Sequence, residues 1–206
     1  MKTPGPHKDR LDRIAREAAR LIALGRTADV QEALHLAAEI LGESGRPLPG
    51  AGRVRQHAQA MTMQELGDAG YAALQREHLA IAEEMMTAIE QAFPDASTLF
   101  VGRGAMGQID AGVTLHIRVY TDETITSLAS AIVEFGYNEP TFKTVQTRFG
   151  PLNRLSLTEE GVEIALTRCL PAMRETSHRD LFTGKPIAAL TLAQLRQKLG
   201  VGTEET

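Results

Sequence analysis

The sequence contains one cysteine, no tryptophan and few other aromatic residues. A single cysteine excludes an internal disulfide and every cysteine-rich zinc pattern. Cys169 lies in an apolar run, which favours a small hydrophobic packing residue over a catalytic thiol. The scarcity of aromatic side chains leaves no obvious stacking platform for nucleic-acid bases.

Long hydrophobic runs are also missing. The longest, such as residues 99–101 and 129–133, fall far short of the roughly 20 residues that a membrane-spanning helix requires. The first residues, MKTPGPHKDR, contain no apolar signal core. We therefore expect a cytoplasmic protein without a membrane partner.

The chain has no large excess of positive charge. Residues 1–60 carry 10 Lys and Arg against 7 Asp and Glu, whereas residues 61–206 carry 12 against 19. This is too little for the electrostatic footprint of a nucleic-acid-binding protein, so nucleic acid is not the expected partner. One basic stripe, formed by Arg13, Arg16 and Arg20, recurs at helical spacing, and a solvated helix face is its favoured interpretation.

The N-terminal part of the sequence has helical periodicity. Apolar residues three and four apart predict helices over residues 8–24, 27–41 and, more weakly, 53–61. The loop-forming sequence ESGRPLPGAG separates the second from the third and is the expected hinge. A longer helix is predicted over residues 68–93, because Pro94 cannot continue it. His78 lies on its apolar stripe and is interpreted as a partly buried residue, not a metal ligand.

After Pro94 the pattern changes to strands. Alternating or short apolar runs predict strands over residues 97–101, 113–120, 141–149, 153–157 and 162–170. Helices are predicted over residues 124–135 and 192–199, the latter capped by Thr191. The expected fold class is α+β, with an N-terminal helical region followed by a mixed β-sheet with flanking helices. We predict a helical region over residues 1–66 and an α/β domain, preceded by its long helix, over residues 67–206.

Residues 95–199 resemble the nucleotidyltransferase superfamily, which has the DNA polymerase β-type fold. The segment LFVGRGAMG at 99–107 is similar to the strand and glycine turn of that family. The strand GVTLHIRVY at 112–120 stands where the family has an Asp-x-Asp pair, and VEIALTR at 162–168 stands where a third carboxylate occurs. The whole chain also looks like a group of bacterial nucleotidyltransferase-like proteins.

The acidic motif implied by this resemblance is degenerate. Nucleotidyl transfer uses two metal ions held by hard carboxylate oxygens. Thr114 and His116 occupy the two Asp positions, and Glu163 is the candidate for the third. Asp110 lies nearby in a turn. A hydroxyl and an imidazole do not replace two negative charges, so no cofactor is expected, and Mg²⁺ only if the chain is an active enzyme.

The glycine turn is the candidate phosphate site. Gly102, Arg103 and Gly104 offer backbone N–H groups and one positive charge, and a helix beginning there would strengthen anion binding. The spacing matches neither the Rossmann nor the Walker pattern. Lys185, in the loop sequence TGKP, is interpreted as a solvated lysine in preference to a phosphate ligand.

Three functional hypotheses follow. The first is a non-catalytic nucleotidyltransferase-like protein that binds a partner protein or a nucleotide. The second is an active nucleotidyltransferase with an altered metal site at Asp110 and Glu163. The third is a regulatory module that binds nucleic acid through the N-terminal arginines. Exposed sheet edges also make a homodimer compatible with the sequence.

Overall fold

The computed structural model describes residues 6–27, 29–110 and 112–201. The chain divides into two compact units, Met1–Ala72 with Asp110–Gly112, and Ala73–Ile109 with Val113–Thr206. No helix within the described ranges is long and apolar enough to cross a membrane. The predicted boundary between residues 66 and 67 stays a prediction.

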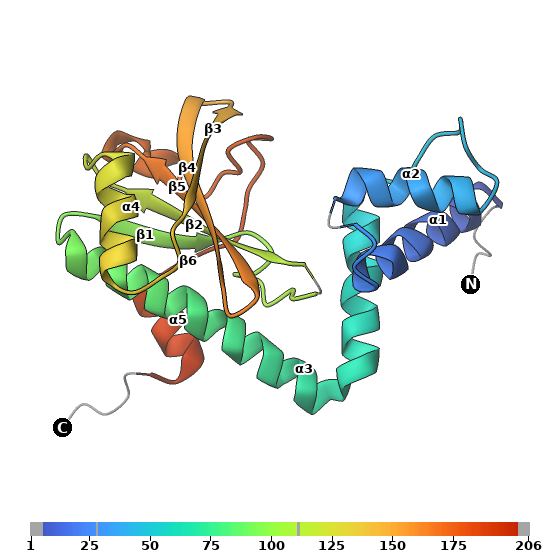
Figure 1. Ribbon diagram of the computed structural model, residues 1–206, viewed down its shortest axis with the longest axis horizontal. Helices are drawn as coiled ribbons and strands as arrows, with labels where there is room; N and C mark the ends of the chain where they lie inside the picture. Colours follow the sequence, from blue (N-terminus) through green and yellow to red (C-terminus); the bar gives the residue numbers. More distant parts are fainter. Residues whose placement is uncertain (1–5, 28, 111, 202–206) are drawn as a thin grey trace. The chain divides into compact units, whose positions relative to one another are not determined.

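The first unit is built from α1 (Pro6–Ala23), α2 (Val30–Ile40) and the first part of α3 (Ala51–Ala92) (Figure 1). Asp29 begins α2, because its carboxylate accepts a hydrogen bond from the Glu32 N–H at 2.8 Å. The buried residues are mostly small, which lets the helices pack closely; they are Ile14, Ala15, Ala18, Ala19, Leu21, Ala33, Leu34, Ala37, Ala38, Val54 and Ala58.

Helix α3 bears out the predicted division into two helices, because it is broken at Gly67, where φ is 65° and ψ is 177°. The stretch after the break matches the long helix predicted over residues 68–93, whereas the first stretch is longer than the predicted 53–61 and begins at Ala51, inside the expected hinge. Glycine adopts this backbone conformation without the steric cost that a Cβ would bring. Leu66 and Asp68 are exposed on either side of the break. The weak periodicity of the first stretch located that helix but not its full length.

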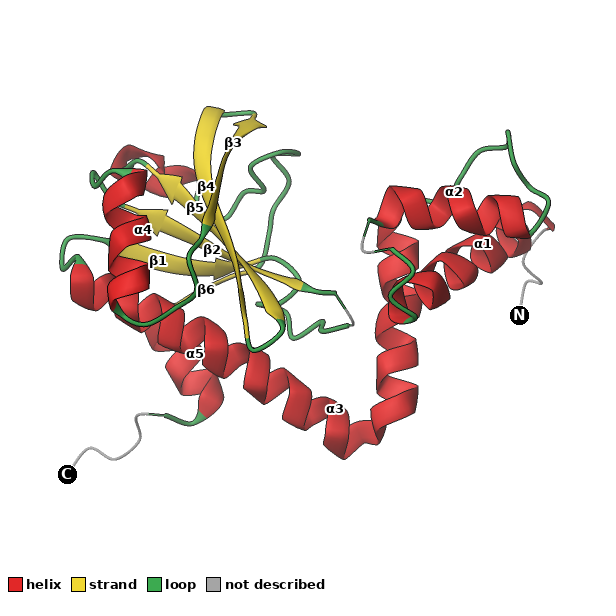
Figure 2. Cartoon of the chain, viewed as in Figure 1, coloured by secondary structure: helices red, strands yellow, loops and turns green. Residues whose placement is uncertain are grey.

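The second unit contains a six-stranded mixed sheet, which confirms the predicted α+β class (Figure 2). Its strand order is β3-β4-β5-β2-β1-β6, and β2 and β5 run parallel while the other neighbours are antiparallel. The strands are β1 (Ser97–Val101), β2 (Thr114–Tyr120), β3 (Thr141–Thr147), β4 (Gly150–Glu159), β5 (Val162–Cys169) and β6 (Ala189–Thr191).

Three helices cover one face of this sheet. They are the second part of α3, α4 (Ile125–Glu134) and α5 (Leu192–Leu199). Thr124 and Thr191 cap α4 and α5 through their side chains, and the Thr191 cap was predicted. Strand β6 was not predicted, because three residues are too few to show a period. It lies beside β1, with Phe100 opposite Leu190.

Candidate functional site

The two faces of the sheet carry different side chains, because successive residues of a strand point to opposite sides. The inner face packs on the helices and is apolar; it includes Phe100, Leu115, Ile117, Val119, Leu155, Leu157, Ile164 and Leu166. We call the opposite side the outer face. On β2, β5, β4 and β3 it carries Thr114, His116, Arg118, Glu163, Ala165, Thr167, Arg154, Ser156, Thr158 and Lys143.

The structure brings the predicted site residues together at one end of the outer face. Thr114 lies directly opposite Glu163 on the parallel strands β2 and β5. The Thr114 hydroxyl donates a hydrogen bond to Glu163 Oε2 at 2.8 Å. His116 follows two residues along β2, on the same face and half-buried. These are the three positions at which the family resemblance implies carboxylates.

This arrangement does not fit a pair of catalytic metal ions. Glu163 is exposed and is the only carboxylate of the three positions. Asp110 is buried in the segment before β2, four residues ahead of Thr114 and not on the strand. Within the described ranges, no group of three or more His, Cys, Asp or Glu side chains is arranged to hold a metal ion. Magnesium pairs require several hard, negatively charged oxygens, which the outer face does not offer.

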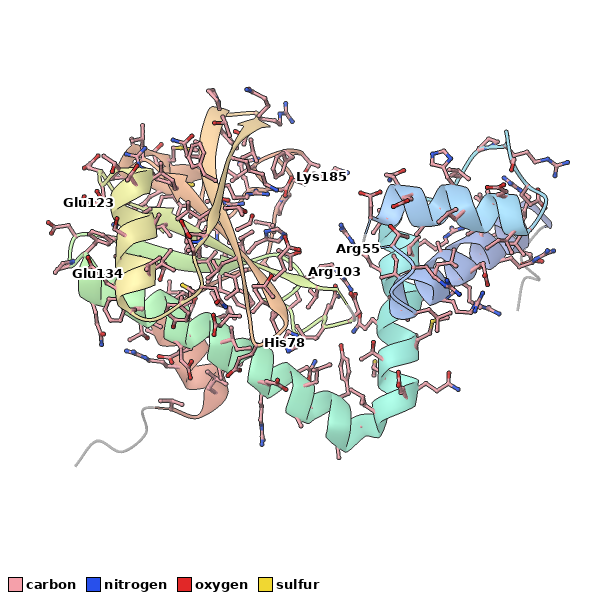
Figure 3. The ribbon with its side chains drawn as sticks, in the orientation of Figure 1. Arg55, His78, Arg103, Glu123, Glu134 and Lys185 are labelled. Atoms are coloured by element: carbon pink, nitrogen blue, oxygen red, sulfur yellow. The ribbon has the colours of Figure 1, made fainter. Side chains whose placement is uncertain are left out.

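The predicted phosphate turn, residues 102–107, is a series of turns from which no helix begins. The Gly102 N–H donates to the Ala188 carbonyl oxygen at 2.9 Å and is therefore engaged within the fold. At Gly104 a Cβ atom would lie 2.4 Å from Phe100 Cζ, so glycine permits the ring to pack there. Arg103 is half-buried in the same turn and is labelled in Figure 3. Packing thus accounts for Gly104 without a ligand.

Residues 178–187 form a hairpin beside the outer face, which we call the 178–187 hairpin. Its two sides are joined by hydrogen bonds from the Ile187 N–H to His178 O at 2.9 Å and from the Asp180 N–H to Lys185 O at 2.7 Å. Burial raises the pKa of Asp180, but hydrogen bonds from Thr183 and Phe182 and the charge of Arg118 lower it overall. Lys185 is exposed near the tip, as predicted for a solvated lysine (Figure 3).

Arg118 holds the base of this hairpin. Its Nη1 donates to Ser177 O at 2.9 Å and its Nη2 to Arg179 O at 2.8 Å. The residue is only 3% exposed, and its buried Nε has no hydrogen-bond partner among the described residues. Strand β2 is therefore buried on both faces at this point.

Arg154 and Arg148 also contact the hairpin. The Arg154 Nε donates to Thr167 Oγ1 at 3.1 Å, and its guanidinium carbon lies 5.6 Å from the centre of the Phe182 ring. Burial lowers the pKa of Arg154, and the nearby Glu163 carboxylate partly opposes this shift. The Arg148 Nη1 donates to Thr183 O at 2.9 Å. All these donors reach neutral acceptors or a ring.

Positive charge therefore gathers on the outer face and its hairpin, although residues 61–206 are acidic as a whole. Six basic residues lie there against two acidic ones, Glu163 and Asp180; the basic ones are Arg118, Lys143, Arg148, Arg154, Arg179 and Lys185. Sequence reasoning missed Arg118, Arg148 and Arg154. The available signal was that Arg118 shares the alternation of Thr114 and His116.

Two other singled-out residues are structural. His78 is buried on α3, and its Nδ1 lies 2.9 Å from the Leu74 carbonyl oxygen one turn earlier. This confirms the buried-stripe interpretation. Cys169 is 1% exposed, and burial raises the pKa of its thiol to about 11. A thiol with this pKa is almost entirely protonated at neutral pH and is a poor nucleophile.

The N-terminal arginine stripe has an ordinary environment. Arg13, Arg16 and Arg20 are exposed on α1. Arg20 forms an ion pair with Glu17, with Nη2 and Oε1 2.6 Å apart. Such a pair on one helix face is typical of a solvated surface, the favoured interpretation of this stripe.

No protein-family model and no curated protein matches the chain. Among solved structures, it is similar to the polymerase core of TRAMP, an RNA surveillance complex, with 17% identity and a TM-score of 0.36 over 47% of this chain and 31% of that chain. It is also similar to a cytoplasmic RNA terminal U-transferase, with 13% identity and a TM-score of 0.37 over 55% of this chain and 34% of that chain.

A third similar structure is the GLD-2/RNP-8 complex, with 15% identity and a TM-score of 0.35 over 54% of this chain and 39% of that chain. The chain thus covers about a third of the length of each matched chain. With TM-scores of 0.35 to 0.37, these likenesses carry no argument about function, which is therefore argued from this chain's own residues.

Proposed function

We propose that this chain is a non-catalytic nucleotidyltransferase-like protein that binds a nucleotide on the outer face of its sheet. The observation that carries this proposal is the hydrogen bond from Thr114 to Glu163 at the three positions that would hold metal ligands. A single carboxylate already bonded to a neutral hydroxyl cannot organise two metal ions around a triphosphate. Catalysis by the family's chemistry would therefore be lost.

Charge favours a nucleotide over a partner protein as the ligand. The outer face and the 178–187 hairpin carry six basic residues in a part of the chain that is acidic overall. Arginine forks and hydroxyl groups are the usual partners of phosphate oxygens in proteins. A protein ligand for this face would have to be acidic.

The proposal is tested by measuring binding and turnover on the same preparation. Thermal-shift titrations with ATP, CTP, GTP and UTP, each with and without Mg²⁺ or Mn²⁺, should raise the melting temperature with at least one nucleotide. Pyrophosphate release from the same mixtures should stay at the level of a protein-free blank. Release above that blank would instead support the active enzyme with an altered site, and the absence of any shift would favour a protein partner.

Restoring the acids provides a gain-of-function test. The double variant Thr114→Asp with His116→Asp would place two carboxylates beside Glu163 on neighbouring strands, and we expect it to bind Mn²⁺ measurably by calorimetry. The matched control is Thr144→Asp with Gln146→Asp, which creates the same spacing on exposed β3, where Asn153 and Pro151 lie opposite. Equal Mn²⁺ affinity of the two variants, or Mn²⁺ binding by the wild type, would contradict this interpretation of the site.

A further inference from the structure

Three cationic residues form a straight row across the outer face. Arg118, Thr167, Arg154 and Lys143 lie directly opposite one another on the consecutive strands β2, β5, β4 and β3. Neighbouring strands are about 4.8 Å apart, so the four residues span roughly 15 Å. The only neutral member, Thr167, accepts the hydrogen bond from Arg154.

No carboxylate among the described residues forms an ion pair with a member of this row. Arg118 is nevertheless almost completely buried, and it has one unpartnered nitrogen and two carbonyl acceptors. Taking a guanidinium ion out of water costs several kcal/mol unless an opposite charge or good hydrogen bonds compensate. The two carbonyl groups and the nearby Asp180 carboxylate, whose pKa the charge of Arg118 lowers, compensate only in part, so the row favours an anion from outside the chain.

The row also has an open end. Lys143 is exposed and Arg154 is half-buried, whereas Arg118 lies beneath the carbonyl groups of Ser177 and Arg179. The Ser156 hydroxyl, buried and without a partner among the described residues, is two residues from Arg154 on the same face of β4. An anion at this end would contact Lys143 and Arg154 directly and would be attracted by the positive charge of Arg118.

We propose that this row binds the phosphate chain of the ligand, and that its fixed arginine charges replace divalent metal ions. Arg154 and Lys143 contact the phosphate oxygens, while Arg118 contributes electrostatic attraction from below the hairpin. Glu163 lies four residues before Thr167 on β5, about 13 Å along the strand, and repels phosphate, so the chain of phosphates is held at the Arg154 end. This inference rests on the proposed function and adds that binding needs no metal ion.

The test is isothermal titration calorimetry of the full chain with inorganic tripolyphosphate and, separately, ATP. Each titration is run in EDTA and again with Mg²⁺. We expect both ligands to bind in EDTA, and Mg²⁺ to leave the affinity unchanged or lower it, because the ion neutralises the phosphates that the arginines attract. Binding that appears only with Mg²⁺ would overturn the inference and leave the proposed function standing.

Variants then locate the site. Arg154→Ala should weaken tripolyphosphate binding at least about tenfold, since charge-assisted hydrogen bonds are lost. Lys143→Ala, on an exposed residue whose loss does not threaten folding, should weaken it about threefold. Arg76→Ala is the matched control, because Arg76 is exposed on α3, away from the outer face, and should change nothing.

The outcomes separate the two proposals. Unchanged affinity in both Arg154→Ala and Lys143→Ala would overturn the row as the binding site even if ATP binds the wild type. Tripolyphosphate binding without binding of any nucleotide would support the row and contradict the proposed function. The absence of binding by both ligands under all conditions would overturn both.

Discussion

The two faces of the sheet are made by the same strands and yet serve different purposes. On the inner face, side chains such as Ile117 and Leu166 are shielded by three helices and bring only packing energy. On the outer face, arginines hold the 178–187 hairpin and its base through backbone carbonyl groups. Side chains that stabilise the fold and side chains that can bind a ligand therefore lie on opposite faces of the same strands, because residues two apart share a face and neighbours do not.

The largest expected loss of stability comes from a substitution on the inner face. Phe100→Ala removes a ring that is fully buried and packed against Gly104, and it should lower the free energy of unfolding by about 3–5 kcal/mol. Thr114→Ala on the outer face is the comparison, and its loss of one exposed hydrogen bond should cost about 1 kcal/mol or less. Urea unfolding of both variants gives the two values, and similar costs would contradict the division between the faces.

An intermediate effect, on the opening of the 178–187 hairpin, is expected when Arg118 beneath it is substituted. Arg118→Met keeps most of the buried volume but removes two hydrogen bonds to the base of the 178–187 hairpin. Amide hydrogen exchange in residues 178–187 should become at least about tenfold faster, because the hairpin opens more often. Arg174→Met, on an exposed residue of the neighbouring 3-10 helix, is the control and should leave this exchange unchanged.

The smallest expected effect is a change in tripolyphosphate affinity, and its direction distinguishes two roles of Glu163. Glu163→Gln removes the negative charge nearest to Arg154 on the outer face and should tighten tripolyphosphate binding by less than about twofold, as expected for a unit charge roughly 13 Å away in water. If Glu163 were instead a metal ligand, the same change would weaken binding in the presence of Mg²⁺. Calorimetry of this variant therefore distinguishes the two roles by direction alone.

The sequence predicted most elements because their signals are local. The periods of 3.6 and 2 residues located the helices and strands, and capping residues such as Thr191 marked where a helix begins. The same alternation placed Thr114 and His116 on one face of β2. It did not predict that residues 102–107 form turns without a helix, or that β6 exists. Those features depend on neighbours that lie elsewhere in the chain.

The fold class, the composition of each face and the lack of an acidic pair at positions 114 and 116 all follow from local sequence. Which residues meet depends on how the strands pair and pack. Thr114 and Glu163 are 49 residues apart and become hydrogen-bond partners only when β2 and β5 pair in parallel. Arg118 is buried because a hairpin about 60 residues further along the chain packs over it. Such a contact follows from tertiary packing, so no local periodicity in the sequence predicts it.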